Sequence, residues 1–301
     1  MKKRAIALFV YSRPDHTEQV LAGLKENGID KLYVFADAPA CEDDMEGVVK
    51  TRKLIDEIDW CEVQKEYKGK NVGLAKSIIR GVSLLFDKGY DRVVVLEDDC
   101  VPSNDFVSFM DACFDFYEAV PEVKHISGFG LPLKYKNHND TYIAPWPCSW
   151  GWGTWKECWE ECDFNNEVEY KALLSNPSEV KKFNYAGDTF SSFLQSYLEG
   201  RVNSWQIRWY FYLFKNNGRC VWSAHSKITN IGFDGTGVHK VRLNWRNQKK
   251  QVKSHPVTSF ESDMNYNQKL ISEFRTFFPG KSIKSRLSSM LTVLRVNLIE
   301  N

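Results

Sequence analysis

The sequence predicts an α/β fold in which a mostly parallel central sheet is flanked by helices. In the first half of the 301 residues, short apolar runs typical of buried strands alternate with amphipathic segments typical of helices. One of these runs, Val93 to Leu96, is apolar at every position, as expected for a parallel strand covered on both faces. The length allows one large domain or two small ones.

Each element of the first half has a local signal. Ser12-Arg13-Pro14-Asp15 turns the chain into a helix, and Asn27-Gly28 is a natural stop for that helix. The loop over 68–73 carries lysines and glycines and leads into another helix. In chain order the predicted elements are strand 5–11, a helix ending at 27–28, strand 32–36, helix 48–58, strand 61–66, helix 74–88 and strand 93–96.

The second half has a less regular pattern. Half of the ten tryptophans lie between Trp146 and Trp159. Trp155 and Trp159 are one helical turn apart and are predicted to be core residues, whereas 145–153 is too rich in glycine and proline for a helix and is predicted to be a loop. The remaining predicted elements are helix 104–117, strand 125–128, helices 188–199 and 205–215, strand 219–223 and a glycine-rich loop over 230–239.

Three consecutive carboxylates, Glu97, Asp98 and Asp99, follow directly on the buried strand. Ligand sites of open α/β sheets lie beyond the carboxyl ends of the strands. Adjacent carboxylates repel one another, and a hard divalent cation with oxygen ligands relieves that repulsion. The triplet therefore predicts a divalent ion held together with the phosphates of a nucleotide, and a polar loop without a ligand is the alternative.

Composition argues against two classes of function. Lys+Arg 40 against Asp+Glu 39 leaves a net charge of +1, which gives no reason to expect nucleic acid as a partner. No run of about eighteen apolar residues is present, so no membrane-spanning helix is expected. The start of the chain does not resemble a signal peptide and the eight cysteines lack Cys-x-x-Cys spacing, so we expect a cytoplasmic protein with reduced thiols.

The last segment, from Lys281 onward, places apolar residues at helical spacing beside basic ones. A basic amphipathic helix of this kind can lie on an anionic membrane surface. Packing against the protein's own body or against a second subunit explains the same pattern. Peripheral contact with the inner membrane face and a homodimer both remain open.

Four stretches, taken in order, resemble a known family. They are Tyr11-Ser12-Arg13-Pro14, 96–102 with Asp105-Phe106 after it, 149–152 with Trp155 and Trp159 after it, and 203–239 from Asn203-Ser204-Trp205 to His239. In this order they resemble glycosyltransferases of the GT-A fold, most closely the N-acetylglucosaminyltransferase I type and related bacterial sugar transferases. The resemblance covers most of residues 4 to 240.

The resemblance implies roles for the acidic residues. Asp99 would be the chief protein ligand of a Mn²⁺ or Mg²⁺ ion, and Glu97 and Asp98 would contact the ribose and the sugar or support the ion. Asp37, after the second strand, would hydrogen-bond the base; a helix N-cap before Pro39 is the alternative.

Basic and loop residues complete the implied donor site. Arg13 would approach the diphosphate, since a guanidinium pairs well with phosphate, and a surface residue in a turn is the alternative. The loop containing Asn71 and Gly73 would lie beside the nucleotide. His239 would approach the diphosphate or the metal ion, although a structural histidine is equally compatible with the sequence.

One position departs from the family pattern. Inverting relatives place their general base just after the first tryptophan of the fourth stretch, where this chain has Gln206, which cannot accept a proton at useful pH. Asp188 is the first candidate for a replacement base, with Asp163 and Asp234 behind it. Retention of anomeric configuration, or binding without transfer, would also explain the glutamine.

Two tryptophans are candidates for the sugar pocket. Trp150 and Trp152 would line the donor-sugar or acceptor pocket, because the C–H faces of sugars pack well on indole. Core packing is the alternative for both.

These observations predict a metal-dependent glycosyltransferase, a hexosyl- or N-acetylhexosaminyl-transferase. It would move a sugar from a nucleotide-diphosphate sugar, UDP by family similarity alone, to a glycan or glycolipid acceptor. A sugar nucleotidyltransferase and a non-catalytic binding protein for nucleotide-sugars or glycans are the alternatives. We expect a single GT-A domain over 1–275, with a nucleotide-binding half at 1–120 and an acceptor-binding half at 121–275, and a helical tail over 276–301.

Overall fold

The computed structural model describes residues 2–135, 138–235 and 254–278. Their main sheet has eight strands, which the buried apolar runs of the sequence supply. In order across the sheet, the strands are β3 (Glu62–Tyr67), β2 (Lys31–Ala36), β1 (Arg4–Val10), β4 (Arg92–Glu97), β8 (Trp152–Trp155), β6 (Val123–Ser127), β9 (Arg219–Ser223) and β7 (Thr141–Ala144).

Most strands of this sheet run in one direction. The four strands β3, β2, β1 and β4 pair in parallel, and β6 and β9 also pair in parallel with each other. Strand β8 runs antiparallel to both β4 and β6, and β7 runs antiparallel to β9. The predicted α/β class with a mostly parallel sheet is confirmed.

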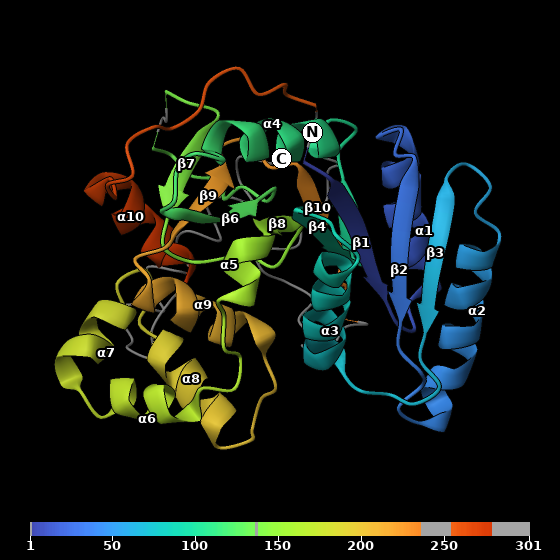
Figure 1. Cartoon of the computed structure of the whole chain (residues 1–301), viewed down its shortest axis with the longest axis horizontal. Helices are drawn as coiled ribbons and strands as arrows, with labels where there is room; N and C mark the ends of the chain where they lie inside the picture. Colours follow the sequence, from blue (N-terminus) through green and yellow to red (C-terminus); the bar gives the residue numbers. More distant parts are fainter. Residues whose placement is uncertain (1, 136–137, 236–253, 279–301) are drawn as a thin grey trace.

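Helices cover both faces of the sheet (Figure 1). The chain steps from β1 to β2 to β3 and then returns to β4, so right-handed crossovers place the first two helices on one face and the third on the other. The helices are α1 (Pro14–Glu26), α2 (Met45–Asp56), α3 (Leu74–Asp87), α4 (Phe106–Tyr117), α5 (Lys156–Glu160), α6 (Glu167–Leu174), α7 (Pro177–Phe183), α8 (Phe190–Leu198), α9 (Trp205–Lys215) and α10 (Gln268–Phe274), with 3₁₀ turns at Glu42–Asp44 and Arg275–Phe277.

Local chemistry explains where the first helices begin. Pro14 opens α1, and its fixed φ suits a first helical turn. Helix α3 begins after Gly73, which has a φ of +80° and therefore adopts a conformation that favours glycine. Helix α3 also packs closely on the sheet, because a Cβ at Gly81 would lie only 2.7 Å from the ring of Phe9.

The stretch over 145–151 is a loop, as predicted, but Trp152 and Gly153 differ from that prediction because they begin β8. The side chain of Trp152 is buried in this strand, and Gly153 lets the strand lie directly under α4. A Cβ at Gly153 would lie 2.7 Å from Phe114 and 2.8 Å from Met110. Close packing between distant segments therefore makes a strand of residues whose local composition indicates a loop.

A second, two-stranded sheet lies beside the main one. It pairs β5 (Cys100–Pro102) antiparallel with β10 (Ile228–Asn230), and we call it the β5–β10 ribbon. At one end of the ribbon the backbone N–H of Ile231 donates to the carbonyl of Asp99 at 2.9 Å. At the other end the N–H of Ser103 donates to the carbonyl of Lys227 at 2.8 Å.

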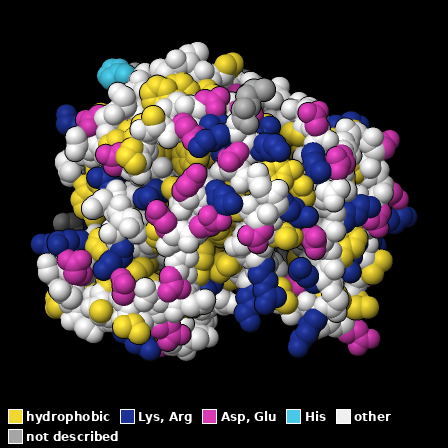
Figure 2. All heavy atoms as spheres, in the orientation of Figure 1, with side chains coloured by type: hydrophobic (Ala, Val, Ile, Leu, Met, Phe, Trp, Pro, Cys, Tyr) yellow, Lys and Arg dark blue, Asp and Glu magenta, His cyan; other side chains and the backbone are white. Residues whose placement is uncertain are grey.

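Helices α6, α7, α8 and α9 lie together at the lower left of Figure 1, and α9 packs on the main sheet through Trp205 and Trp209. On the face drawn in Figure 2, acidic and basic side chains are interspersed, in keeping with the net charge of +1. Among the described residues, none of the helices has the length and apolar character needed to cross a bilayer. The amphipathic helix predicted from Lys281 lies outside the described residues.

Candidate active site

The acidic triplet lies where the sequence places it, at the carboxyl end of a central strand. Strand β4 is buried along its length and ends at Glu97, and Asp98 and Asp99 form the turn that leads into β5. Asp98 is buried at 4 % exposure, and the backbone N–H of Tyr11 donates to its Oδ2 at 3.2 Å. The ends of β1 and β4 therefore meet at the triplet.

Arg13 joins the first helix to the triplet. It stands immediately before α1, and its Nη2 donates to Asp99 Oδ2 at 2.9 Å and also to Asp98 Oδ1. Burial by itself would lower the pKa of Arg13, but the charges of Asp99 and Asp98 outweigh burial and raise it. The guanidinium is therefore a permanent positive charge between two carboxylates.

One guanidinium does not neutralise three carboxylates. Burial and then the charges of Asp99 and Asp98 raise the pKa of Glu97 to about 8. Burial also raises the pKa of Asp98, and Arg13 opposes this shift without reversing it. Among the described residues, we find no hydrogen bond or ion pair to the Glu97 side chain. A further positive charge at this position would relieve the repulsion.

The donor set fits a hard divalent cation. Carboxylate oxygens are the ligands that Mg²⁺ and Mn²⁺ favour, and the triplet offers them with an excess of negative charge. Asp99 is the most accessible partner of Arg13, with 16 % of its side chain exposed against 6 % for Asp98. These residues are compatible with the Mn²⁺ or Mg²⁺ that the sequence resemblance implies.

The loop after β10 covers the triplet. Gly232 lies so close to Asp99 that a Cβ on it would be 2.2 Å from Asp99 Oδ2. The next residue, Phe233, packs edge to face on Trp150 at 5.5 Å between ring centroids. Asp234 then approaches the first turn of α1, where His16 Nε2 lies 3.3 Å from its Oδ2. Thus one short loop places a glycine against Asp99, an aromatic ring on Trp150 and a carboxylate beside His16.

Asp37 is bound by backbone donors of the loop before α3. Its Oδ1 accepts hydrogen bonds from the N–H groups of Ala38 at 2.9 Å and Val72 at 3.1 Å. Its Oδ2 accepts from Val72 at 3.1 Å and from Gly73 at 2.8 Å. These three backbone donors engage both oxygens of a residue that is 8 % exposed, so the carboxylate holds the loop before α3. The predicted contact of Asp37 with a base stays a prediction.

Asn71 and Arg52 support the same loop. The Asn71 side-chain amide donates to the carbonyl of Ala38 at 2.6 Å, so Asn71 fastens the loop to the end of β2. Arg52 donates to the carbonyls of Asp37 at 3.1 Å and Lys68 at 2.8 Å. No local pattern signals Arg52, because its partners are backbone atoms of segments that follow different strands.

A cavity of about 310 Å³ lies near this loop, between the carboxyl ends of β2 and β3 and helix α3. Its lining includes Ala36, Lys68 and Arg80. It is separate from the triplet, whose residues do not line it.

The two candidate tryptophans have different environments. Trp150 is partly buried and contacts Phe129 and Phe233, so it lies next to the loop that covers Asp99. Trp152 is fully buried and stacks on Trp205, with ring centroids 4.6 Å apart, and on His125. The prediction of Trp152 as a pocket residue is therefore corrected, because a fully buried indole offers no face to a sugar.

The candidates for the general base are dispersed. Gln206 donates its amide to the carbonyl of Pro147 at 2.6 Å, which anchors the tryptophan-rich stretch to α9. Asp188 precedes α8 in the helical group and forms an ion pair with Arg275, and no contact of Asp188 with the triplet is found among the described residues. Asp163 accepts the N–H of Asn165 at 2.9 Å in the turn before α6. Asp234 is the candidate carboxylate that lies on the loop over the triplet, while His239 lies outside the described residues.

No family model matches the chain, and no curated protein matches it. Among solved structures, one similar chain is a mannosyltransferase from Pyrobaculum calidifontis in complex with GDP-Man and Mn²⁺. The two share 13% identity with a TM-score of 0.42, over 72% of this chain and 70% of that chain. Another is a cytidylyltransferase from Leptospira borgpetersenii, with 12% identity and a TM-score of 0.34 over 57% of this chain and 68% of that chain. At these TM-scores neither likeness assigns a function to this chain.

Proposed function

We propose that the protein is a GT-A-type glycosyltransferase that uses a nucleotide-diphosphate sugar and a divalent metal ion. The observation that carries the proposal is the triplet Glu97-Asp98-Asp99 at the carboxyl end of β4, bridged by Arg13 and covered by the loop at 231–235. A ligand site at this end of the sheet, with excess negative charge and a neighbouring guanidinium, suits a metal-bound diphosphate.

Each group of the site has a task in this proposal. Asp99, supported by Asp98, would hold Mn²⁺ or Mg²⁺, which supplies positive charge to the diphosphate leaving group when bound. Arg13 remains charged. In the complex its guanidinium binds phosphate oxygens, which take the place of the carboxylates as its partners. Trp150 offers a partly exposed ring beside the covering loop for the sugar.

Asp234 is the proposed acceptor of the proton from the acceptor hydroxyl. It replaces Asp188 as first candidate, because it lies on the covering loop and its side chain is 42 % exposed. His16, at 3.3 Å, orients this carboxylate. Replacement of Asp234 by Asn should lower turnover while leaving nucleotide affinity unchanged, since the amide retains the shape but not the basicity.

The test is calorimetry of UDP, GDP, CDP and dTDP with and without manganese. The expected result is one preferred nucleotide that binds only with manganese, and loss of that binding in Asp99→Ala. When the protein is incubated with the matching nucleotide-sugar and without acceptor, we expect slow release of the nucleotide. The rate of release measures transfer of the sugar to water. Absence of binding by all four nucleotides under both conditions would refute the proposal.

A non-catalytic nucleotide-sugar-binding protein is the second candidate, and Gln206 favours it. The structure uses this side chain to anchor Pro147, not as a base. Both candidates predict manganese-dependent binding, but only the enzyme predicts release of nucleotide from its sugar and sensitivity of that release to Asp234→Asn.

A further inference from the structure

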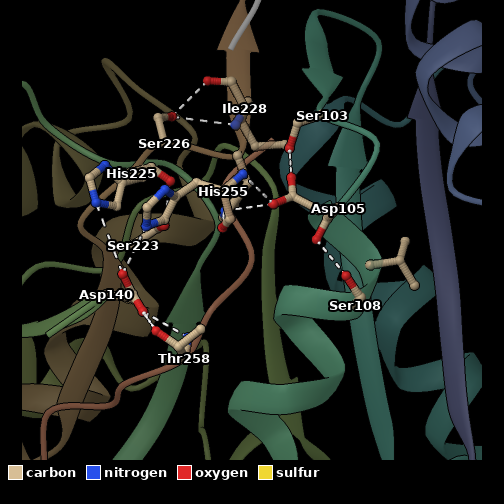
Figure 3. Close-up of polar contacts among 12 residues, drawn as sticks. Ser103, Asp105, Ser108, Asp140, Ser223, His225, Ser226, Ile228, His255 and Thr258 are labelled. Carbon is tan, nitrogen blue, oxygen red and sulfur yellow. Dashed lines mark hydrogen bonds and ion pairs between the residues drawn. The ribbon is translucent and has the colours of Figure 1, made fainter. Parts of the chain in front are cut away.

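A second polar cluster lies apart from the triplet and consists of Asp140, His225 and His255. One ligand atom from each residue lies within 4.8 Å of the others. Asp140 immediately precedes β7, His225 follows the end of β9, and His255 belongs to the segment that begins the last described range. Figure 3 shows the three side chains pointing toward one another.

The carboxylate of Asp140 is held in one orientation. Its Oδ2 accepts the N–H of Thr258 at 2.7 Å and of Ser259 at 3.0 Å, and the Thr258 hydroxyl at 3.0 Å. Its Oδ1 faces the imidazoles instead, with His255 Nε2 at 3.1 Å and His225 Nε2 at 4.0 Å. The backbone donors thus aim one carboxylate oxygen at two ring nitrogens.

The two imidazoles also converge. Their ring centroids lie 3.8 Å apart with the planes tilted by 44°, and the Nε2 atom of each points to the same Asp140 oxygen. Both side chains are about half exposed, at 54 % for His225 and 49 % for His255, so an ion can reach them from solvent. The arrangement therefore combines convergent ligand atoms with an entry path.

The geometry approaches that of a tetrahedral metal site. With metal–ligand bonds of about 2.0–2.1 Å, neighbouring ligand atoms of a tetrahedral zinc ion lie about 3.3 Å apart. The two Nε2–Oδ1 distances of 3.1 and 4.0 Å bracket this value. Two imidazoles and one carboxylate form a ligand set that suits zinc and related transition metals better than Mg²⁺.

We propose that Asp140, His225 and His255 bind a divalent transition-metal ion of the zinc type. The ion would link the start of β7, the end of β9 and the segment at 255–259. His225, His255 and Asp140 supply three ligands, and solvent completes the coordination.

The surrounding residues hold this site in place. The N–H of His255 and the Nζ of Lys227 both donate to Asp105 Oδ2, each at 2.8 Å, and Lys227 is 1 % exposed. Asp105 immediately precedes α4, so His255 is tied to this helix as well as to Asp140. Metal binding therefore does not have to order the segment that supplies His255.

The proposed site and the triplet lie at opposite ends of the β5–β10 ribbon. Asp99 directly precedes β5 at one end, while Lys227 directly precedes β10 at the other. The two sites share no residue, so the metal-binding proposal is independent of the proposed function.

Zinc and cobalt binding to the full-length, tag-free protein after chelator treatment tests the proposal. With excess Mg²⁺ present to occupy the triplet, we expect one Zn²⁺ per chain, measured by competition with a chromophoric chelator. Co²⁺ should give the intense visible absorption of a tetrahedral site with nitrogen ligands. His225→Ala and His255→Ala should each weaken zinc affinity at least about tenfold and reduce the cobalt absorption.

Two control variants separate this site from other histidines and from the triplet. His138→Ala removes an exposed histidine close to Asp140 in sequence, and it should leave zinc affinity unchanged. Asp99→Ala should also leave it unchanged. A thermal scan shows that the variants fold, and zinc should raise the melting temperature of wild type but not of His225→Ala or His255→Ala. Zinc binding that survives both histidine substitutions, or absence of zinc binding by wild type, would overturn the proposal.

Discussion

The two polar clusters of this molecule are built in opposite ways. The triplet consists of three consecutive residues at the end of one buried strand, and it crowds carboxylates around one guanidinium. The cluster of Asp140, His225 and His255 joins segments up to 115 residues apart and has one carboxylate for two imidazoles. The first is visible as a sequence motif, whereas the second exists only after folding.

The difference in composition also sets different cation preferences. Excess carboxylate charge favours hard ions such as Mg²⁺ and Mn²⁺, and imidazole favours zinc-type ions. Each region should therefore respond to its own substitutions and its own ion.

Arg13→Gln should have the largest effect on stability. It removes the cation from two carboxylates, of which Asp98 is buried, and breaking a buried ion pair costs about 3 kcal/mol. We expect the free energy of unfolding, measured in urea at pH 8, to fall by about that amount. Manganese should restore part of the loss, whereas zinc binding by the histidine cluster should stay unchanged. Equal stability of Arg13→Gln and wild type would show that the guanidinium does not balance the triplet.

Acid should produce the next largest effect, through a histidine that belongs to neither cluster. Burial lowers the pKa of His125 to about 3, and the side chain is 0 % exposed. Its Nδ1 accepts the indole N–H of Trp209 at 3.2 Å, so its Nε2 carries the proton that faces the Cys148 carbonyl at 3.0 Å. A second proton would bind to Nδ1, where its N–H group would face the N–H donor of Trp209 and the hydrogen bond would be lost.

The sign of this pH effect follows from the lowered pKa. In the unfolded chain His125 has a pKa of about 6.5, so below this pH the unfolded chain binds a proton that the folded chain does not bind. The free energy of unfolding therefore decreases as the pH decreases. From pH 7 to pH 5 the loss through His125 should be about 2 kcal/mol. In His125→Gln this part of the dependence should disappear, and denaturant titrations at the two pH values measure the difference. An unchanged pH dependence would contradict the assignment to His125.

Gly232→Ala should damage the triplet without a large loss of stability. The new Cβ would lie 2.2 Å from Asp99 Oδ2, so the carboxylate or the covering loop must move. We expect manganese-dependent nucleotide affinity to fall about tenfold, which corresponds to about 1.4 kcal/mol. Gly69→Ala is the matched control, because a Cβ there has no neighbour within 4 Å. Equal nucleotide affinities of the two variants would show that the loop does not constrain Asp99.

Thr258→Val should have the smallest effect and should act on the histidine cluster alone. It removes the hydroxyl that donates to Asp140 Oδ2 at 3.0 Å but keeps the backbone donors of Thr258 and Ser259. The loss of one hydrogen bond is worth about 1 kcal/mol, so zinc affinity should fall about fivefold. A fall as large as that in His255→Ala would mean that the hydroxyl, not the backbone, orients Asp140.

Local patterns were sufficient to predict the strands and helices from β1 to β4, but not the short strands β5 and β7 that follow. Strand β4 and the triplet depend on adjacent residues, and α1 depends on Pro14 and on the stop near Gly28. Strand β8 could not be predicted in this way, because Gly153 favours a strand only once α4 packs on it.

The same limit holds for the candidate site, of which only the parts formed by adjacent residues could be predicted. The resemblance implied that Arg13 belongs to the site. The folded sheet explains its position beside the triplet, since Arg13 and the triplet follow neighbouring central strands. The occupied oxygens of Asp37, the burial of Trp152 and the approach of Gly232 to Asp99 depend on contacts between distant segments. No local pattern contains that information.

The full set of backbone donors on Asp37 has a consequence for ligand entry. The loop at 70–73 is already ordered in the folded protein. A ligand that binds beside it therefore costs little further conformational entropy. Binding at such a preorganised surface should be fast and should change the backbone little.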